Sequence, residues 1–575
     1  MGAKLINRVF IGLVMAGALA AMVACGPATQ PSQTTGGVEP PKMEERPGAE
    51  VARERGGKQV MVETSAFGNP NDPHLVVTAT GRVYSMPVVN WLLKRDIYQK
   101  GYPIIGDLAK SWDVSKDGLK YTFKLQEGVK FHNVAPVNGR EFTSEDVKYN
   151  LLRLTADPSV TLEKWKPRFQ RAVDFGKIKS IETPDKYTAV INLEQPYAPF
   201  IDAISHPGTA MLPKEFVETF PEKIINEGMI GTGPFMPGTE YKNQQIATYK
   251  KNPGYWKKDS AGGQLPYLDE LTFLYFGDIQ SELAAFRARQ IDSTRASSDI
   301  KASTVESIKK DQPGIRVFYT PTTNITNYRF NMKFKPFQDV KVRRAIHLTV
   351  DRHQYVDLLL EGAGTISGPV TSAIYPDVAN TMDWLLQQPG YRKDKTQDIE
   401  EAKRLMKEAG YGDGFEVGMM TSTGAQAGDT MALLQDQLKP LKITIKPEQV
   451  DYAGQWLPRA TQGEFEFAHM SHTVTTDVDS VIGAHLPSGA PRNYGKFSDP
   501  VLDELVKKEL ASTTPEERKK WAQEAEMRIF ETAPMIFLYT RVNTLLAQPW
   551  VHNAGDGPVP GSTAYMVEQL WVEKH

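Results

Sequence analysis

The chain of 575 residues has a single cysteine, Cys25, which directly follows an apolar run near the amino terminus. Residues 9–23 contain no charged side chain, and Lys4 and Arg8 precede them. A run of about 15 residues is shorter than the roughly 20 that a membrane-spanning helix needs, and the small residues at its end are typical of an export signal. A lone cysteine cannot form an intrachain disulfide bond, so core packing alone must hold the fold.

The residues around Cys25 resemble a bacterial lipobox, with Met22 at a position where leucine is usual. The resemblance implies that residues 1–24 are a signal peptide and that Cys25 is lipidated. The lipid would hold the protein at the extracytoplasmic face of the cell membrane or in the periplasm. An ordinary cleaved secretion signal is the alternative. Residues 25–57 lack apolar periodicity and are rich in proline, glycine and polar residues, which predicts a flexible tether.

The remaining 518 or so residues are too many for one hydrophobic core, because a single core stops growing at roughly 250–300 residues. The composition, 40% hydrophobic and 24% charged, is ordinary for a globular protein. The formal net charge is −2, so no strong field would attract nucleic acid, and we expect no nucleic-acid partner.

Periodicity and turn residues predict an α+β region in the first half. Thr143 and Asp146 have the spacing of a helix-capping box, and Gly118 and Gly128 supply turns. The predicted elements are strands at 59–62, 121–125 and 187–193, and helices at 88–98 and from 143 onward.

In the second half, predicted helices alternate with predicted strands, which indicates a sheet covered by helices. The strands are 415–420 and 443–450, and the helices begin at Asp339, Asp398, Asp499 and Thr514.

Familiar catalytic motifs are absent from the sequence. It contains no Gly-x-Ser-x-Gly elbow, His-Glu-x-x-His helix, Walker loop, Rossmann fingerprint or Cys-x-x-Cys pair. Paired carboxylates such as Glu516 and Glu517 lie at predicted helix starts, where they stabilise the positive end of the helix dipole. We therefore expect a protein that is not an enzyme and has no cofactor.

An ordered set of short blocks covers nearly the whole chain after the tether. They include Gly-Asp-Leu-Ala-Lys-Ser-Trp at 106–112, Gly-Thr-Gly-Pro-Phe at 231–235, Asn-Pro-Gly-Tyr-Trp at 252–256, Arg-Ala-Arg-Gln-Ile-Asp at 287–292 and Val-Arg-Arg-Ala at 342–345. Together they resemble the family 5 extracellular solute-binding proteins, which are the peptide and nickel-complex receptors of ABC importers.

This resemblance implies an α/β, two-lobed, periplasmic-binding-protein-like fold of type II, in the large family 5 form with an extra α+β subdomain. Lobe 1 would comprise 58–275 plus 539–575, with the subdomain at about 84–200, and lobe 2 would comprise 276–538. Two chain crossings would form the hinge. A ligand that touches both lobes would favour a closed state, which a membrane permease could recognise. We expect a monomer that meets the membrane through its lipid only.

The resemblance also implies ligand contacts, since family members line the cleft with aromatic residues and a few polar anchors. The positions that match are Tyr84, Met86, Tyr149, Trp456 and Tyr539. Trp456 could equally be a core residue, and Tyr539 a plain strand residue.

Residues 465–479 depart from the peptide receptors, which show a Gly-Trp pair and then an aspartate that holds the amino terminus of the peptide. Here Ser471 and His472 replace the pair, and Val474 or Thr475 takes the acidic position. A buried ammonium without its counter-charge costs about 3–5 kcal/mol. Either Asp477 or Asp479 therefore substitutes, or the ligand is not a free peptide.

His469, His472 and Thr473 are further candidates for ligand contact. The two imidazoles suggest a metal ion, but residues three apart share a face only in a helix, and this segment is predicted to be a strand or loop. We expect no metal site.

The sequence thus predicts a lipid-anchored receptor of an ABC importer for a peptide or similar medium-sized polar solute. A receptor for a metal chelate or oligosaccharide is the alternative within the fold. A secreted hydrolase or a sensor without transport is the alternative of another class.

Overall fold

The computed structural model describes residues 50–574 except 53, 64–71, 76–83, 100–101, 162–168, 170, 220–228, 243–245, 424–426, 476 and 556–561. The predicted signal peptide, the predicted lipidation site Cys25 and most of the predicted tether lie outside the described residues. In the described part, no helix has both the length and the apolar character needed to cross a membrane.

A four-stranded sheet combines one strand from the start of the described chain with three strands from residues 235–275. Its order is β1 (Lys58–Glu63), β10 (Glu270–Tyr275), β9 (Ile246–Lys251) and β8 (Phe235–Lys242). β1 runs parallel to β10, and the other pairs are antiparallel. The predicted strand at 59–62 is confirmed as part of β1.

A second four-stranded sheet forms the small α+β region, as predicted. Its order is β4 (Ala109–Val114), β5 (Lys120–Leu125), β7 (Thr188–Leu193) and β6 (Ile178–Asp185), all antiparallel. Gly118 turns the β4–β5 hairpin with a φ of +69°. α2 (Ser144–Leu154) packs on this sheet, and its Asp146 accepts from the Thr143 amide at 2.9 Å, which confirms the capping box. The region also contains α3 (Ala172–Phe175), α4 (Phe200–Ser205) and α5 (Lys214–Thr219).

The predicted helix at 88–98 is wrong. This segment holds a single 3-10 turn, η1 (Met86–Val88), and the strand β2 (Leu93–Arg95), which pairs with β3 (Ile104–Gly106). The Trp91 amide donates to Asp107 Oδ2 at 2.8 Å, and the Trp91 indole donates to the Pro207 carbonyl at 2.9 Å. Partners distant in sequence take the place of helical hydrogen bonds, and local periodicity cannot reveal them.

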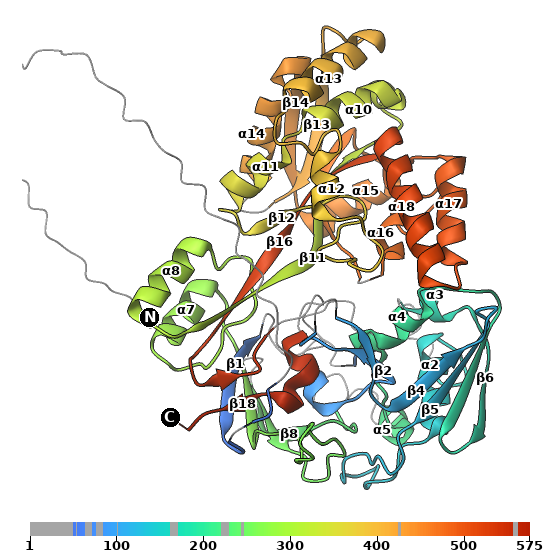
Figure 1. Cartoon of the computed structure of the whole chain (residues 1–575), viewed down its shortest axis with the longest axis vertical. Coiled ribbons are helices and arrows are strands. Elements are labelled where there is room, and N and C mark those ends of the chain that lie inside the picture. The colour runs from blue at the N-terminus through green and yellow to red at the C-terminus, as the bar shows by residue number, and fades with distance from the viewer. Residues whose placement is uncertain are drawn as a thin grey trace, which may run out of the picture. The chain divides into compact units, whose positions relative to one another are not determined.

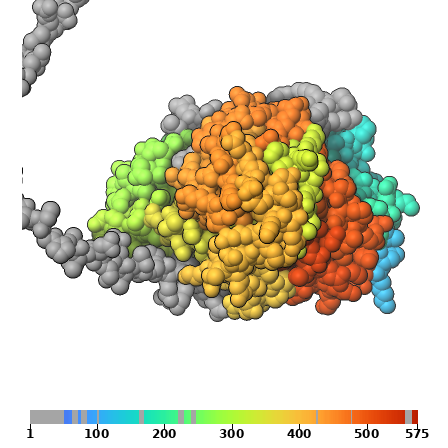
Figure 2. Space-filling model, turned by 90° about the horizontal axis from the view of Figure 1, so that it is seen from above, coloured from blue at the N-terminus to red at the C-terminus, as the bar shows by residue number. Residues whose placement is uncertain are grey.

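A six-stranded mixed sheet organises the second half, and the predicted alternation of strand and helix is confirmed (Figure 1). Its order is β12 (Gly364–Ile366), β16 (Met535–Ala547), β11 (Arg316–Phe330), β15 (Phe467–Thr473), β13 (Phe415–Ser422) and β14 (Ile443–Val450). The longer helices are α10 (Val340–Thr349), α13 (Thr396–Glu408), α14 (Ala427–Gln437), α17 (Pro500–Leu510) and α18 (Pro515–Thr532). In Figure 2 the red residues of α17 and α18 lie beside the orange residues that precede them in the chain.

The shorter helices of this half are α9 (Lys335–Gln338), α11 (Arg352–Gln354), α12 (Met382–Gln387), α15 (Leu457–Gln462) and α16 (Asp479–Ile482), with π-helical turns at Tyr355–Leu359 and Tyr452–Trp456. A 3-10 turn at Lys439–Leu441 also belongs to this half, whereas the 3-10 turn at Pro207–Thr209 belongs to the first half.

Three of the four predicted helix starts are confirmed, because Asp339, Asp499 and Thr514 each accept from a first-turn amide of the helix that follows. Asp398 is not a cap. Its helix begins two residues earlier, and its buried carboxylate instead accepts from the Gly390 amide and from Lys395 Nζ, both at 2.9 Å.

The two longest strands, β11 and β16, pair along most of their length, and the pairing is interrupted between Pro321 and Ile325. α7 (Ile279–Arg287) and α8 (Ala302–Asp311) share a hydrophobic cluster with Val62 of β1 and Leu546 of β16. The predicted lobe boundary at 539 falls inside β16. The segment after 275, which contains α7 and α8, packs against β1 through this cluster. The lobe boundaries and the hinge stay predictions.

The last described residues return to the first half of the chain. They form β17 (Val551–His552), η7 (Ser562–Gln569) and β18 (Trp571–Val572). Lys94 and Glu568 form a buried ion pair at 2.7 Å. Lys257 lies 3.7 Å from the same glutamate and also pairs with buried Asp107. Two cations and two anions thus share one interior network that joins distant parts of the sequence.

Candidate ligand-binding site

A cavity of about 350 Å³ is lined by the small α+β region and by the second half of the chain. From the first come Arg95, Tyr102, Pro103, Ile104, Ala198, Ile201 and Asp202, and from the second come Ile374, Tyr375, Pro376, Asp377, Val378, Asp477, Val478 and Arg518. Among these described residues, Asp477 is the predicted ligand residue. The walls combine aliphatic and aromatic side chains with two ion pairs and the carboxylate of Asp377, a mixture that suits a solute with polar and apolar parts.

The ion pairs of the wall are internally neutralised. Arg518 of α18 donates to both carboxylate oxygens of Asp477, at 2.6 and 2.7 Å, and also to Glu509 of α17 at 2.7 Å. On the other side of the cavity, Arg95 pairs with Asp202. Since Arg518 already occupies Asp477, a ligand ammonium would have to compete with a guanidinium for that carboxylate.

Two neighbouring acids titrate far from their ordinary range. Burial, and then the negative charge of Asp477, together raise the pKa of Asp479 to about 7, although Arg518 opposes the shift. Burial also raises the pKa of Glu509 to about 8, although Arg518 opposes this shift. Asp477, Asp479 and Glu509 together therefore carry less negative charge at neutral pH than three ionised carboxylates would.

The predicted residues of β15 point to opposite faces of the sheet, as strand alternation requires. His469 Nδ1 lies 2.9 Å from the Thr421 hydroxyl, whereas His472 Nδ1 accepts from the side-chain amide nitrogen of Asn327 at 2.7 Å on the other face. Thr473 is exposed and donates to Asn324 at 2.6 Å. Burial lowers the pKa of His469 to about 4. In the part of the chain that the structure describes, no group of three or more His, Cys, Asp or Glu residues is placed to hold a metal ion.

Trp456 packs in a small hydrophobic cluster and is 1% exposed. Its ring lies 5.7 Å from that of Tyr452 and 6.3 Å from that of Tyr494. Tyr539 is buried in β16, 6.2 Å from the Tyr355 ring.

Tyr84, Met86 and Tyr149 belong to the core of the first half. The Tyr84 carbonyl accepts from the Tyr249 hydroxyl at 2.9 Å. The predicted aromatic residues thus fall in three separate hydrophobic clusters and are not brought together here. Their contact with a ligand stays a prediction.

Sequence analysis did not find Arg518, Arg95 or Asp202. Arg518 lies 41 positions after Asp477, and only the packing of α18 beside the segment around α16 brings them into contact. Without knowledge of that packing, Arg518 is one of many helix-surface arginines.

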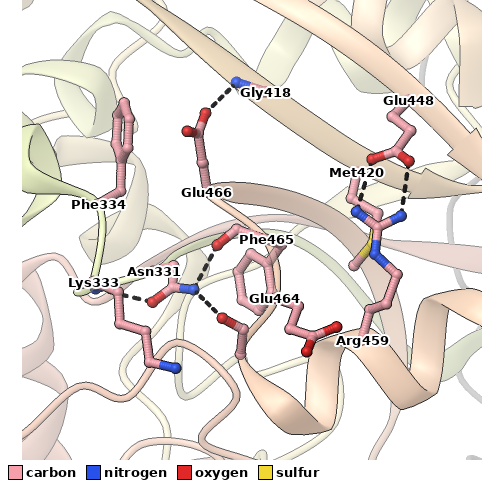
Figure 3. Close-up of a pocket in the computed structure, with 11 residues that line it drawn as sticks. Asn331, Lys333, Phe334, Gly418, Met420, Glu448, Arg459, Glu464, Phe465 and Glu466 are labelled. Carbon is pink, nitrogen blue, oxygen red and sulfur yellow. Dashed lines mark hydrogen bonds and ion pairs between the residues drawn. The ribbon is translucent and has the colours of Figure 1, made fainter.

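A second cavity, of about 580 Å³, lies beside β13 and β14 (Figure 3). Arg459 donates to the two oxygens of Glu448 at 2.7 and 2.9 Å, and Glu466 accepts from the Gly418 amide at 2.6 Å. Asn331 donates to the Gly463 carbonyl at 2.9 Å. No predicted ligand residue is among the described residues that line it, and residues of the small α+β region are absent from that lining as well.

Curated relatives match along most of the chain. Heme-binding protein A of Haemophilus influenzae is 27% identical over 506 residues, which cover 85% of this chain and 86% of that protein. Di/tripeptide-binding protein 1 of Pseudomonas aeruginosa is 27% identical over 455 residues, covering 76% and 80%. Both proteins are named for the solute that they bind.

Solved structures show the same fold. HbpA2 from Haemophilus parasuis superposes with a TM-score of 0.76 at 24% identity, over 90% of this chain and 100% of that one. The predicted two-lobed α/β fold is thereby confirmed. The family model for bacterial extracellular solute-binding proteins, family 5 (middle region), matches residues 103–489. This chain therefore belongs to the family 5 bacterial extracellular solute-binding proteins.

Proposed function

We propose that this chain is the extracytoplasmic substrate-binding lipoprotein of an ABC importer, and that it captures a peptide or a similar medium-sized polar solute. Members of its family are transport binding proteins rather than enzymes, and they work outside the cytoplasm. The proposal adds the lipid on Cys25, the monomeric state and the class of solute.

The main support for the proposal is the cavity of about 350 Å³ in a chain that matches family 5 along two thirds of its length. Residues from two regions line it, so a solute held there would contact both. Such a solute stabilises the arrangement in which both contacts exist, and a permease can read that arrangement.

The relatives support a solute-binding role but differ in their solutes, which include heme and di- or tripeptides. In this chain Arg518 occupies Asp477, so the wall offers no unpaired carboxylate at that position to a peptide amino terminus. A metal chelate or an oligosaccharide is the alternative solute in the same fold.

The test begins with mass spectrometry of the solute that copurifies with the protein expressed with its signal peptide. The same spectra report a diacylglyceryl group on Cys25. Adding the identified solute at 100 times its Kd should stabilise the folded protein by about 2.7 kcal/mol, since ligand adds RT ln(1 + [L]/Kd).

A cavity-filling variant localises the binding. Ile201→Trp should abolish the stabilisation by solute, whereas Leu358→Trp, at a side chain that is 66% exposed, should not. No stabilisation across peptide, sugar and metal-chelate panels would contradict the proposal. Conversion of a bound peptide or glycan to product would favour a secreted hydrolase, and failure to stimulate any importer ATPase would favour a sensor.

A further inference from the structure

The wall of the cavity of about 350 Å³ contains one charged side chain without a partner among the described residues. Two arginines and three aspartates line this cavity. Arg95 pairs with Asp202, and Arg518 pairs with Asp477. The remaining residue, Asp377, is exposed and forms no hydrogen bond or ion pair with another residue that the structure describes. The lining therefore carries a surplus of one negative charge.

Asp377 lies at the tip of a tight turn. The Tyr375 carbonyl accepts from the backbone amides of Val378 at 3.3 Å and of Ala379 at 2.9 Å. Pro376 precedes Asp377 and restricts the backbone further. The side chain of Tyr375 is buried in a hydrophobic cluster of the second half, which anchors the turn. The backbone that carries the Asp377 carboxylate is therefore ordered before a solute arrives.

Apolar side chains face the cavity from both regions that line it. Ile104 and Ile201 belong to the small α+β region, and Ile374 and Val378 belong to the second half. These four side chains offer a solute contact area but no hydrogen bond. The wall therefore suits the aliphatic part of a solute.

The two arginines of the wall are already engaged. Arg518 donates to both carboxylate oxygens of Asp477 and to Glu509. Arg95 pairs with Asp202 and also donates to the Tyr102 carbonyl at 2.9 Å. Because carboxylates of the protein neutralise both guanidinium groups, they give an anionic solute little advantage over a cationic one.

Three acids beside the lining residues add to the negative surplus. Burial is the first cause that raises the pKa values of Asp174, Asp479 and Glu509, and the charges of neighbouring carboxylates also raise them. The pKa of Asp479 is about 7, and that of Glu509 is about 8. A cation in the cavity would reduce the repulsion among these groups. The charged side chains that act on the three acids are Arg171, Asp174, Lys177, Asp202, Asp477, Asp479 and Arg518.

From this wall we infer that the cavity selects a solute with an ammonium group beside an aliphatic part, and that Asp377 is the counter-charge of that ammonium. The inference rests on the proposed receptor function and names the charge of its solute. Asp377 is exposed, so the ammonium reaches it without a rearrangement of the protein. At this position the ammonium also keeps part of its hydration, which avoids the cost of sealing a charge away from water.

The test compares butylammonium, 1-butanol and butyrate on the purified full chain, freed of its copurified solute. The three probes are similar in size and differ in charge. Butylammonium should raise the melting temperature in a concentration-dependent way, and 1-butanol and butyrate should not. Asp377→Asn should weaken butylammonium binding roughly 5-fold, the effect of one partly exposed ion pair. Asp383→Asn, which changes an exposed carboxylate of α12 outside the cavity lining, should leave this binding unchanged.

Butylammonium binding should also tighten between pH 6 and pH 8.5. Asp479 ionises near pH 7 and Glu509 near pH 8, so each adds negative charge beside the cavity over this range. An aliphatic ammonium stays protonated throughout, because its pKa is about 10, as in lysine. The binding of 1-butanol, which is neutral, should not change with pH.

A second pair of probes distinguishes two sources of the ammonium group. If Leu-Leu binds more tightly than N-acetyl-Leu-Leu at pH 6.5, the ammonium is a peptide amino terminus. If the two bind equally and butylammonium still binds through Asp377, the solute is an amine that is not a peptide.

Three results would overturn the inference. Butylammonium could stabilise the protein no more than 1-butanol or butyrate does, Asp377→Asn could bind butylammonium as tightly as the wild type does, or the affinity for butylammonium could fail to rise with pH. If the copurified solute still binds in any of these cases, the receptor function stands and only the preference for a cation is rejected.

Discussion

Replacement of Arg518 by leucine tests how charge is balanced at the wall of the candidate site. The Arg518 side chain is 19% exposed, and its partners Asp477 and Glu509 are 6% and 0% exposed. Arg518→Leu keeps the aliphatic packing but leaves two carboxyl groups buried without their cation. Breaking a buried pair in this way costs about 3–5 kcal/mol, and we expect a loss of that size in the free energy of unfolding at pH 8.5.

The loss should be smaller at pH 5.5. The folded-state pKa of Asp479 is about 7 and that of Glu509 about 8, above their ordinary values of 3.8 and 4.5. Groups with a raised pKa stabilise the fold at low pH, and this contribution disappears as the pH rises through the folded-state pKa. Arg518 lowers both pKa values, so its removal raises them further and steepens the decline toward pH 8.5.

Urea unfolding followed by circular dichroism at pH 5.5 and 8.5 measures both effects. The control is Arg528→Leu in the same helix, where the arginine side chain is 31% exposed and pairs with Asp499. That variant should lose about 1 kcal/mol or less, with little dependence on pH. A loss below 1 kcal/mol for Arg518→Leu at pH 8.5, or an equal loss at both pH values, would refute the reasoning.

Two further predictions concern buried rings. Trp456→Ala should lower the free energy of unfolding, measured by urea titration, by about 3–5 kcal/mol, because it empties the space beside Tyr452 and Tyr494. A variant with normal stability but weakened solute binding would instead place Trp456 in the cleft. Burial, and then the charge of Arg153, lower the pKa of His74 from 6.5 to about 4. As the pH falls from 6.5 to 4, the unfolded chain binds a proton that the folded protein does not, so the free energy of unfolding decreases by up to about 3 kcal/mol. His74→Gln should make that acid decline shallower, and an unchanged acid decline would count against this assignment.

Local signals in the sequence predicted the elements that depend on local chemistry. The capping box at Thr143, the cap at Asp499 and the alternation at 121–125 were sufficient to place α2, α17 and β5. Prediction failed where hydrogen-bond partners that are distant in the sequence determine the backbone conformation. Residue 91 is held by Asp107 and Pro207, and Asp398 serves a loop rather than its own helix.

The candidate site was less predictable than the fold, because its charges pair across elements. Asp477 was found from its position in the chain, but its partner Arg518 comes from a helix with no special motif. The hydrogen bond between buried Arg329 and His485 was also invisible in the sequence, since the two residues are 156 positions apart. The position of a segment in a family pattern predicts that it lies near the ligand. Only tertiary packing shows which of its side chains are already paired with another side chain of the protein.

The interior network of Lys94, Asp107, Lys257 and Glu568 has a consequence for biogenesis. Lys94 and Glu568 are 474 positions apart, yet each is nearly inaccessible to water. Until residue 568 is available to the folding chain, Lys94 and Lys257 have one carboxylate to share, and sealing them from water would be unfavourable. An exported chain that delivers residue 94 first would therefore complete this buried network only after residue 568 has also crossed the membrane.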